Sequence, residues 1–412
     1  MKAVPTIETE KVSVKGAQIC FVSPFAYGAI AGSQDGHLGG VERQTALMGR
    51  WLADRGHRVS VITWDEGQAD GVQIDGMTIY RMCRKNAGVK GLRFVWPKWT
   101  SLVAAMKRAE AQVYYQNCGE YVTGQVALWC RRQGRRFVYS VASDPDCDAR
   151  LPEMHKRRER VLYRYGLGRA DRVIVQTRRQ QEMLRSGFGR EAAVIPMPCP
   201  GPSSQEYDRF DGARSDSHRV LWIGRICEVK RPDRLLDIAQ ACPDLQIDFV
   251  GPASETEYAR NVYARALTLP NVVVHGPATR ARVEEFYRAA RVLCCTSDFE
   301  GFPNTFLEAW SWGVPVVSTC DPDHLIAARG LGRFGTEPGE LVRGIRELLD
   351  APEQWRQASR SARAYYVSHH ALDSAMEQFE RVFCELAGST GAPQRGVLRW
   401  GPHHRPTAGE SL

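Results

Sequence analysis

The chain has 412 residues, a formal net charge of +8, and a composition that is 43% hydrophobic and 25% charged. At about 100–200 residues per domain this length predicts two or three folded cores, and the composition excludes disordered and fibrous proteins. The mean hydropathy is negative, no apolar run approaches about 18 residues, and residues 1–16 lack an apolar signal segment, so we expect a protein of the cytoplasm or of a membrane surface.

The positive charge is concentrated in the first half of the chain. Residues 1–200 hold 31 Lys and Arg against 19 Asp and Glu, a net charge of +12, which leaves −4 for residues 201–412. Such an asymmetry indicates that the first half meets an anionic partner, which a phosphate-bearing substrate, a membrane surface or nucleic acid would each provide.

Short apolar segments rich in β-branched or aromatic residues alternate with helix-period segments from residue 17 to about 350, which is typical of parallel α/β architecture. A helix is predicted over Glu42–Asp54, where an apolar stripe runs up to Gly56. We therefore predict a Rossmann-like, doubly wound first domain at residues 17–200. Its expected strands are Gln18–Pro24, Arg58–Thr63, Gln112–Tyr115, Arg136–Ala142, Arg172–Gln176 and Ala193–Pro196.

The alternation breaks between residues 196 and 218, where Pro, Gly, Ser and charged residues replace apolar periodicity. We predict a linker at 201–217 and a second Rossmann-like domain at 218–371. A helix at 372–387 is expected to pack back on the first domain, and the tail at 388–412 is expected to be disordered. The alternating segments of the second domain are Arg219–Ile223, Pro232–Ala241, Leu245–Val250, Asn271–His275, Arg282–Ala290, Val292–Thr296, Asn304–Trp312 and Val314–Thr319.

Two tandem α/β domains leave a cleft between them, and open parallel sheets bind ligands outside the carboxyl ends of their strands. The segment 297–317, SDFEGFPNTFLEAWSWGVPVV, follows such a strand. Glu300 in its loop and Glu308 in its helix can reach the same mouth of the cleft, and the free N–H groups of residues 304–307 can bind a diphosphate. Because carboxylates accept hydrogen bonds from hydroxyls, this arrangement suits a sugar-phosphate ligand.

A purely structural explanation of this segment is also open. Thr305 and Glu308 fit a capping box, in which Glu308 would only satisfy a backbone N–H group. Glu300 would then be a solvated loop residue.

Two basic residues favour a phosphate site. Arg225 and Lys230 follow the strand Arg219–Ile223, and both cations are suited to stabilise charge that develops on a diphosphate leaving group. The alternative is that they pair with Glu228 or Asp233 at the surface.

A glycine pair near the start adds a third element. Gly39 and Gly40 open a helix after the first strand, so their backbone can approach a phosphate or a sugar from the opposite domain. A glycine pair before a helix is also commonly only a turn.

In this order, these pieces resemble the retaining glycosyltransferases of family four (glycosyl transferases group 1), which have the GT-B fold of two Rossmann-like domains facing a central cleft. The resemblance covers residues 17–387. The matching residues are Gly39-Gly40-Val41-Glu42-Arg43, Gly224-Arg225 with Lys230, the Glu300-Gly-Phe-(five)-Glu308 loop and the run Trp312-Gly313-Val314-Pro315-Val316-Val317.

The resemblance implies that the second domain binds a nucleotide-diphosphate sugar and that a hexosyl group passes to an acceptor hydroxyl with retention of configuration, without a metal or other cofactor. Glu308 would hold the ribose hydroxyls, Arg225 and Lys230 the diphosphate, and Glu300 hydroxyls of the transferred sugar. The further donor contacts that it implies are the backbone amides of Phe302, Asn304 and Thr305 and, beside the base, the loops at Gly251 and His275-Gly276.

Two positions depart from the family's pattern. Pro303 stands where many members have a second glycine, so one amide is absent from the loop. Many members also place a His at the end of a late first-domain strand, where this chain has Ser143 or Asp144. We predict that Asp144 takes this place as a catalytic residue, because a carboxylate can accept a proton or stabilise positive charge at the reacting carbon.

Other motifs predict no site. The segment Gly330–Gly335 matches GxGxxG but follows no clear strand, so we predict a loop. The Asp-Pro-Asp triplets at 144–146 and 321–323 resemble a metal-binding DxD motif, but Asp-Pro is ordinary turn chemistry and we expect no metal site. The 12 cysteines include no CxxC pair, so we interpret them as reduced, mostly buried thiols.

The basic residues of the first half cluster at 81–108, 131–136 and 155–169. In the first cluster aromatic and basic residues interleave, namely Phe94, Trp96 and Trp99 with Lys90, Arg93 and Lys98. Such a mixture can enter an anionic membrane interface, although a solvated helix flank with aromatics in the core explains it equally. We expect no nucleic-acid binding, because the chain has no recognised binding module.

The sequence therefore predicts a cytoplasmic or peripheral-membrane enzyme that moves a sugar from a nucleotide-diphosphate donor to an acceptor hydroxyl. The basic first domain favours an acceptor in lipid-linked glycan or polysaccharide biosynthesis. Two alternatives stay open: a nucleotide-sugar epimerase of the same fold, and a non-catalytic protein that kept the fold to bind a membrane or another transferase.

Overall fold

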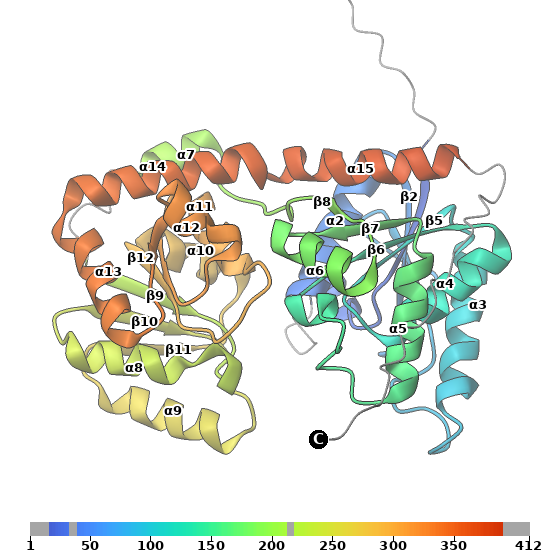
Figure 1. The fold of residues 1–412 in the computed structure, drawn as a ribbon, viewed down its shortest axis with the longest axis horizontal. Coiled ribbons are helices and arrows are strands. Elements are labelled where there is room, and N and C mark those ends of the chain that lie inside the picture. The colour runs from blue at the N-terminus through green and yellow to red at the C-terminus, as the bar shows by residue number, and fades with distance from the viewer. Residues whose placement is uncertain (1–15, 33–38, 212–217, 390–412) are drawn as a thin grey trace, which may run out of the picture.

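The computed structural model describes residues 16–32, 39–211 and 218–389, and the predicted tail lies outside these ranges from residue 390 onward. Within them the chain forms two α/β domains, with two long helices running across both (Figure 1). The predicted pair of doubly wound, largely parallel sheets is confirmed.

The first domain is built on an eight-stranded sheet in the order β3-β4-β2-β1-β5-β6-β7-β8. Neighbouring strands are parallel except β3 and β4, which are antiparallel. The strands are β1 (Gln18–Val22), β2 (Arg58–Thr63), β3 (Val72–Ile74), β4 (Met77–Arg81), β5 (Val113–Asn117), β6 (Arg136–Ser140), β7 (Arg172–Val175) and β8 (Ala193–Val194). The helices are α1 (Tyr27–Ala31), α2 (Gly40–Asp54), α3 (Thr100–Ala109), α4 (Tyr121–Gln133), α5 (Arg157–Arg169) and α6 (Arg178–Phe188), with a π-helical turn at Phe94–Trp99 and a 3-10 turn at Asp144–Cys147.

The second domain has a six-stranded parallel sheet in the order β11-β10-β9-β12-β13-β14. The strands are β9 (Arg219–Ile223), β10 (Gln246–Val250), β11 (Val272–Gly276), β12 (Val292–Cys295), β13 (Val316–Ser318) and β14 (Gly332–Phe334). The helices from here to the end of the described chain are α8 (Pro232–Ala241), α9 (Glu257–Thr268), α10 (Arg280–Ala289), α11 (Asn304–Ser311), α12 (Leu325–Arg329), α13 (Pro338–Asp350), α14 (Pro352–His369) and α15 (Leu372–Gly388), with 3-10 turns at Glu228–Lys230 and Pro322–His324.

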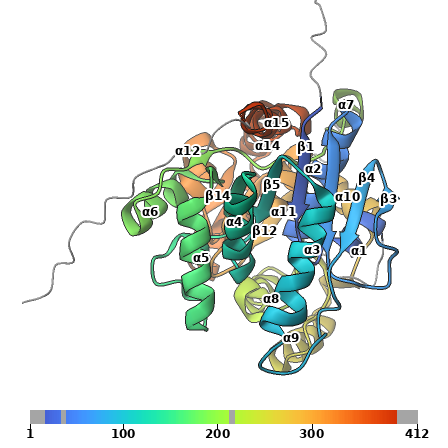
Figure 2. The same cartoon turned by 90° about the vertical axis from the view of Figure 1, so that its right-hand side faces the viewer.

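Each face of the first sheet packs on different helices. In β1, Ile19 and Phe21 share a core with α2 and α15, whereas Cys20 and Val22 share one with α3, α4 and α5. Figure 2 looks onto the second of these faces, where α4 lies between α3 and α5. This alternation follows from the period of two along a strand.

The helices α14 and α15 tie the two domains together (Figure 1). Helix α14 packs on α11 and α13 of the second domain. In α15, the rings of Phe379 and Phe383 lie 6.4 and 5.6 Å from the ring of Tyr115 in β5, and Phe383 also lies 6.3 Å from Phe21. The core of the first domain is therefore completed by a helix from the far end of the chain.

The chain crosses between the domains twice, and the two crossings are hydrogen bonded to each other. The Cys199 N–H group donates to the His370 carbonyl oxygen at 2.9 Å, and the Tyr366 hydroxyl donates to the Cys199 carbonyl oxygen at 2.8 Å. Cys199 also forms a parallel bridge with Ala371, between α14 and α15.

One predicted loop is a strand. The segment Gly330–Gly335 contains β14, in which Gly332 pairs with Val316 of β13. Gly332 has a φ of 154°, and a Cβ there would lie 1.8 Å from the Val316 carbonyl oxygen. The loop prediction is wrong because this glycine permits a short strand to approach its neighbour closely.

Two further elements escaped prediction. The hairpin β3–β4 turns at Asp75 and Gly76, whose φ values of 48° and 73° are those that an Asp-Gly hairpin turn requires. The predicted linker contains a helix, α7 (Ser204–Asp211), and the Glu206 carboxylate accepts a hydrogen bond from the Ser203 N–H group at 2.8 Å. Both had a short sequence signal, an Asp-Gly dipeptide and a Ser-x-x-Glu capping box.

All 12 cysteines are free and seven of them are buried, as predicted. None of the helices in the described ranges combines the length and apolarity that crossing a bilayer requires.

Candidate active site

Helix α11 begins after the loop that follows β12. Pro303 precedes it with φ −66° and ψ 123°, and the Phe306 N–H group donates back to the Pro303 carbonyl oxygen at 3.0 Å. In the described part of the chain, the backbone N–H groups of Asn304 and Thr305 have no hydrogen-bond partner. These two free amides, at the positive end of the helix dipole, can bind an anion.

Glu308 lies in the second turn of α11 and is not a capping residue. The capping-box alternative is wrong, because Pro303 and not Thr305 precedes the helix. The Tyr287 hydroxyl of α10 donates to Glu308 Oε2 at 2.8 Å, and among the described residues Oε1 has no partner. Burial raises the pKa of Glu308, against the opposing effects of Tyr287 and two nearby arginines. One carboxylate oxygen is thus fixed and the other is free to accept hydrogen bonds from hydroxyls.

Lys230 and Glu300 form an ion pair. The Lys230 ammonium donates to Glu300 Oε1, and the Ser297 hydroxyl donates to the same oxygen at 2.7 Å. Burial lowers the pKa of Lys230, but the Glu300 charge outweighs burial, so the pKa is raised and the ammonium is retained. Lys230, Ser297, Glu300 and Thr305 line one cavity, which reaches to the start of α11.

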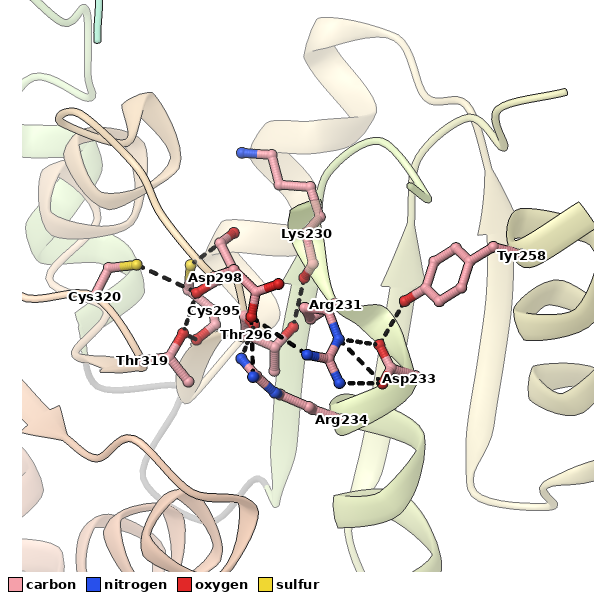
Figure 3. A network of polar contacts seen from close by, with 11 residues as sticks. Lys230, Arg231, Asp233, Arg234, Tyr258, Cys295, Thr296, Asp298, Thr319 and Cys320 are labelled. Atoms are coloured by element: carbon pink, nitrogen blue, oxygen red, sulfur yellow. Dashed lines mark hydrogen bonds and ion pairs between the residues drawn. The ribbon is translucent and has the colours of Figure 1, made fainter. Parts of the chain in front are cut away.

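A neighbouring ion-pair network fixes the loop that carries Lys230 (Figure 3). Arg231 donates to Asp233 through three hydrogen bonds of 2.8 to 3.2 Å and also lies 3.3 Å from Asp298. The Thr296 hydroxyl donates to the Lys230 carbonyl oxygen at 2.9 Å. The Lys230 side chain points away from this network (Figure 3), so the predicted alternative of a pair with Glu228 or Asp233 is wrong.

Arg225 follows the tightly packed ends of three strands. A Cβ on Gly251, whose φ is 140°, would lie 1.8 Å from the Gly224 carbonyl oxygen, and the Gly251 N–H group donates to the Gly276 carbonyl oxygen at 2.8 Å. Arg225 itself is exposed, and in the described ranges its guanidinium has no ion-pair or hydrogen-bond partner. It is therefore free to bind a ligand anion.

His275 is directed into the sheet. Its Nε2 lies 2.8 Å from Oδ1 of the buried Asp248, and its ring lies 4.5 Å from that of Phe286. Only the backbone of the His275–Gly276 loop is left to border a ligand. The Phe302 side chain is buried in a similar way, with its ring 5.1 Å from the ring of His370. Only the backbone of Phe302 is therefore available to a ligand.

The first domain contributes a second helix start opposite α11. Gly39 precedes α2, and a Cβ on Gly40 would lie 2.6 Å from Asn304 Nδ2. Gln44 Nε2 donates to Asn304 Oδ1 at 3.3 Å and to the Pro198 carbonyl oxygen at 3.0 Å. The starts of α2 and α11 thus face each other, and any side chain at position 40 would displace Asn304.

The loop after β6 meets the loop that carries Glu300. A Cβ on Gly301 would lie 3.2 Å from the Ser143 Cα atom, so the domains touch here. Asp144 Oδ1 accepts a hydrogen bond from Gln180 Nε2 at 3.1 Å, and Arg179 Nε lies 3.5 Å from Oδ2. The Asp144 carboxylate is held by α6, while Ser143 is the residue next to the Glu300 loop.

The structure brings most predicted residues to one region. Lys230, Glu300 and Thr305 share a cavity, and Asn304 links it to the glycine pair of the first domain. Asp144 has no direct contact with Glu300 or Lys230 among the described residues, but it adjoins their loop through Gln180. Gln180 Nε2, which donates to Asp144, would lie 3.4 Å from a Cβ on Gly301.

Three polar residues of this region were not predicted: Ser297, Tyr287 and Gln44. Ser297 stands three residues before Glu300, which is a usable signal. Tyr287 and Gln44 lie inside helices, where the sequence offers no sign that they contact Glu308 and Asn304.

The two Asp-Pro-Asp triplets hold backbone N–H groups in place. In the first, Asp146 accepts hydrogen bonds from the Gly119 and Ala142 N–H groups at 3.1 and 3.3 Å, and the second caps helix starts. Asp321 accepts a hydrogen bond from the Ile326 N–H group at 2.7 Å, and Asp323 accepts from the Arg178 and Arg179 N–H groups at 2.7 and 3.0 Å, at the start of α6. In the described ranges, no group of three or more His, Cys, Asp or Glu side chains is arranged to hold a metal ion.

Two family models match the chain. One is described as "Glycosyl transferase 4-like domain" and matches residues 39–200, and the other as "Glycosyl transferases group 1" and matches residues 203–365. Together they cover the second sheet, the first sheet except β1 (Gln18–Val22), and most of the linker.

Curated relatives include several D-inositol 3-phosphate glycosyltransferases. That of Mycolicibacterium vanbaalenii is 26% identical over 52% of this chain and 54% of its own length, and that of Mycobacteroides abscessus is 30% identical over 57% and 56%. The chain thus spans about half the length of these relatives. A third, from Gordonia bronchialis, is 24% identical over 85% of this chain and 86% of its own.

Solved structures show the same architecture. Sucrose-phosphate synthase from Thermosynechococcus elongatus matches with a TM-score of 0.74 at 18% identity, covering 90% of this chain and 100% of that chain. Anabaena HepE in complex with UDP-glucose matches with a TM-score of 0.70 at 17% identity, covering 89% and 99%. At these identities the likeness concerns the fold.

Proposed function

Because the chain belongs to the group 1 glycosyltransferases of the family-four type and has the GT-B fold, we propose that it transfers a sugar from a nucleoside-diphosphate sugar to an acceptor hydroxyl with retention of configuration. The arrangement around α11 carries the proposal. Free amides at the helix start are flanked by the Lys230–Glu300 pair on one side and by Glu308 on the other. In a nucleoside-diphosphate sugar the diphosphate lies between the ribose and the transferred sugar. Its binding site therefore requires an anion site with a carboxylate on each side to accept hydrogen bonds from the hydroxyls of the two sugars.

Each residue then has a role on the donor. Lys230, Arg225 and the amides of α11 stabilise the negative charge that develops on the departing diphosphate. Glu308 accepts hydrogen bonds from ribose hydroxyls through its free oxygen, and Glu300 does so from the transferred sugar. No metal is part of this proposal, and chelation with EDTA should leave turnover unchanged.

The acceptor approaches from the first domain, where Ser143 adjoins Gly301. Its hydroxyl attacks the anomeric carbon on the face that the diphosphate leaves. The new carbon–oxygen bond forms as the bond to the diphosphate breaks, and the acceptor proton passes to the departing phosphate. We propose that Asp144, in the same loop as Ser143, stabilises the positive charge at that carbon.

The acceptor that we propose is lipid-linked or part of a growing polysaccharide, reached at a membrane surface. The net charge of +12 on residues 1–200 supports an anionic environment for the first domain. The curated relatives are named for a phosphorylated inositol. D-inositol 3-phosphate is therefore the soluble acceptor to compare with a lipid-linked or polysaccharide acceptor.

Thermal unfolding in the presence of nucleotide-diphosphate sugars tests the donor site. UDP-glucose is the first donor to use, since HepE was solved with it. A donor that binds the folded form raises the midpoint with concentration. Glu308→Ala should abolish this rise, and a rise that persists in the variant would contradict the site.

Turnover distinguishes transfer from epimerisation. Wild-type enzyme incubated with donor alone should leave the sugar's configuration unchanged, and product should form only when an acceptor is added. Conversion of the donor without an acceptor would favour the epimerase instead.

A further inference from the structure

The segment between β4 and α3 carries a cluster of exposed apolar side chains. Of the eleven large hydrophobic side chains that are exposed in the described residues, four lie within eight positions: Val89, Leu92, Val95 and Trp96, at 67, 69, 57 and 64% exposure. Single exposed hydrophobic residues are ordinary, but four in one short segment are a local concentration, which we call the apolar patch.

The apolar patch is held in place from beneath. The Phe94 ring lies 5.3 Å from that of Tyr121 and 5.9 Å from that of Trp99. The Arg158 guanidinium covers the same Phe94 ring at 4.5 Å. Because Phe94 is packed inward on α4 and α5, the outward positions of Val95 and Trp96 follow from the packing.

Basic side chains surround the apolar patch and form its rim. The rim consists of Arg84, Lys85, Lys90, Arg93, Lys98, Lys156 and Arg158. Burial lowers the pKa of Lys98, and the charges of Arg93, Lys85 and Lys156 lower it further, so these cations lie close together. Acids also face the rim. Asp65 lies 4.0 Å from Arg84, Glu159 lies 3.4 Å from Lys156, and Glu120 lies near Lys85, whose charge acts to lower the Glu120 pKa. The rim therefore keeps a net positive charge.

The apolar patch lies beside the cleft. Its segment follows the carboxyl end of β4, where the Lys85 ammonium covers the Phe25 ring at 4.7 Å and the Lys98 ammonium covers the Trp64 ring at 5.3 Å. Phe25 and Trp64 follow β1 and β2, so the segment crosses the sheet edge from which the acceptor enters.

We propose that the apolar patch and its basic rim dock the protein on an anionic lipid bilayer, with the cleft open towards the lipid surface. Apolar side chains enter the interface while the surrounding cations meet anionic head groups. A second copy of the chain is a poor occupant, because two such rims would bring like charges together. This docking proposal rests on the proposed function only for the identity of the acceptor, which the lipid surface supplies.

Flotation with vesicles tests the docking surface. Wild-type protein should bind vesicles of phosphatidylcholine with phosphatidylglycerol, bind phosphatidylcholine alone weakly, and lose binding as salt rises. Each basic residue near an anionic surface strengthens binding about fivefold, so Lys90→Gln with Arg93→Gln should weaken it about 25-fold. Leu92→Ser with Trp96→Ser should weaken it at least about tenfold, the loss expected for two apolar side chains. The control Leu267→Ser, on α9 of the second domain and 65% exposed, should bind like wild type.

Each contrary outcome overturns the proposal: equal binding to both vesicle types, salt-independent binding, or full binding by either double variant. Absence of vesicle binding together with a dimer that the Leu92 and Trp96 changes dissociate would assign the apolar patch to a second copy instead. Thermal shifts with UDP-glucose, measured on the same samples, separate this proposal from the previous one. Vesicle binding without a thermal shift from any of the nucleotide-diphosphate sugars would refute the transferase site and leave docking intact. A thermal shift without vesicle binding would refute docking and leave the transferase site intact.

Discussion

Replacing Lys230 by alanine should weaken both stability and catalysis, for separable reasons. The Lys230 and Glu300 side chains are 33% and 15% exposed, between a surface pair and a buried one. Losing one partner of a buried pair costs about 3–5 kcal/mol, and a surface pair contributes about 0–1 kcal/mol. Because the Ser297 hydroxyl still donates to Glu300, we expect the free energy of unfolding to fall by about 1–2 kcal/mol.

The catalytic loss should be larger. Lys230 is the cation next to the start of α11, and removing one group that stabilises developing negative charge costs about 10²–10³-fold in kcat. The double variant Lys230→Met with Glu300→Gln removes both charges and keeps the Ser297 hydrogen bond. Its free energy of unfolding should return to within about 1 kcal/mol of wild type, while its activity should stay low.

Urea unfolding and steady-state transfer from UDP-glucose measure the two effects, with Lys107→Ala, an exposed lysine of α3, as the matched control. Recovery of activity in the double variant would show that Lys230 serves only to neutralise Glu300. Unchanged kcat in Lys230→Ala would refute its role at the leaving group altogether.

Three further changes probe neighbouring groups. Arg225→Ala should lower kcat/KM for the donor roughly tenfold, because it removes a cation that stabilises the departing diphosphate. The urea midpoint should stay unchanged, because the side chain is exposed and has no partner in the described ranges; a lowered midpoint would contradict this. Tyr287→Phe should raise the donor KM roughly tenfold with kcat little changed, since only the orientation of Glu308 is lost; an unchanged KM would exclude this role. Burial, followed by the charges of nearby acids, raises the pKa of Glu120 to about 7 from 4.5, so the folded protein keeps a proton that the unfolded chain releases, and stability falls as pH rises from 4.5 to about 7. Glu120→Gln should remove this decline and be more stable than wild type at pH 8 by about 1–3 kcal/mol in urea unfolding; an equal decline in both proteins would refute the assignment.

The sequence predicted the architecture because a strand buried on both faces and an amphipathic helix leave distinct periodic patterns. Those patterns need length, and the elements that escaped have little. The strands β3 and β14 have three residues each, which is too few to show a period. Gly332 reads as a loop residue in sequence, and only its closeness to Val316 shows why a strand requires it.

The candidate site was predictable where the chemistry is local. Arg225 and Lys230 follow one strand, and Glu300 lies in the loop after another. Their residue types and their positions after predicted strands are enough to assign them to the site. The pairing of Lys230 with Glu300 was not predictable, because it depends on β9 and β12 being neighbours in the sheet. The partner of Asp233 is Arg231 and not Lys230, and this depends on the backbone conformation. Arg231 has a φ of 44°, in the left-handed region, and this conformation directs the Arg231 side chain towards Asp233.

The position of α15 has a consequence for how the protein is made. Phe379 and Phe383 close the core of the domain that leaves the ribosome first, yet they are among the last described residues to be synthesised. At about 5–20 residues per second, the first sheet waits for roughly ten to forty seconds after its last strand with Phe21 and Tyr115 uncovered. During vectorial synthesis the second domain therefore folds beside an unfinished neighbour, and the nascent first domain is the natural client of a chaperone that binds apolar surfaces.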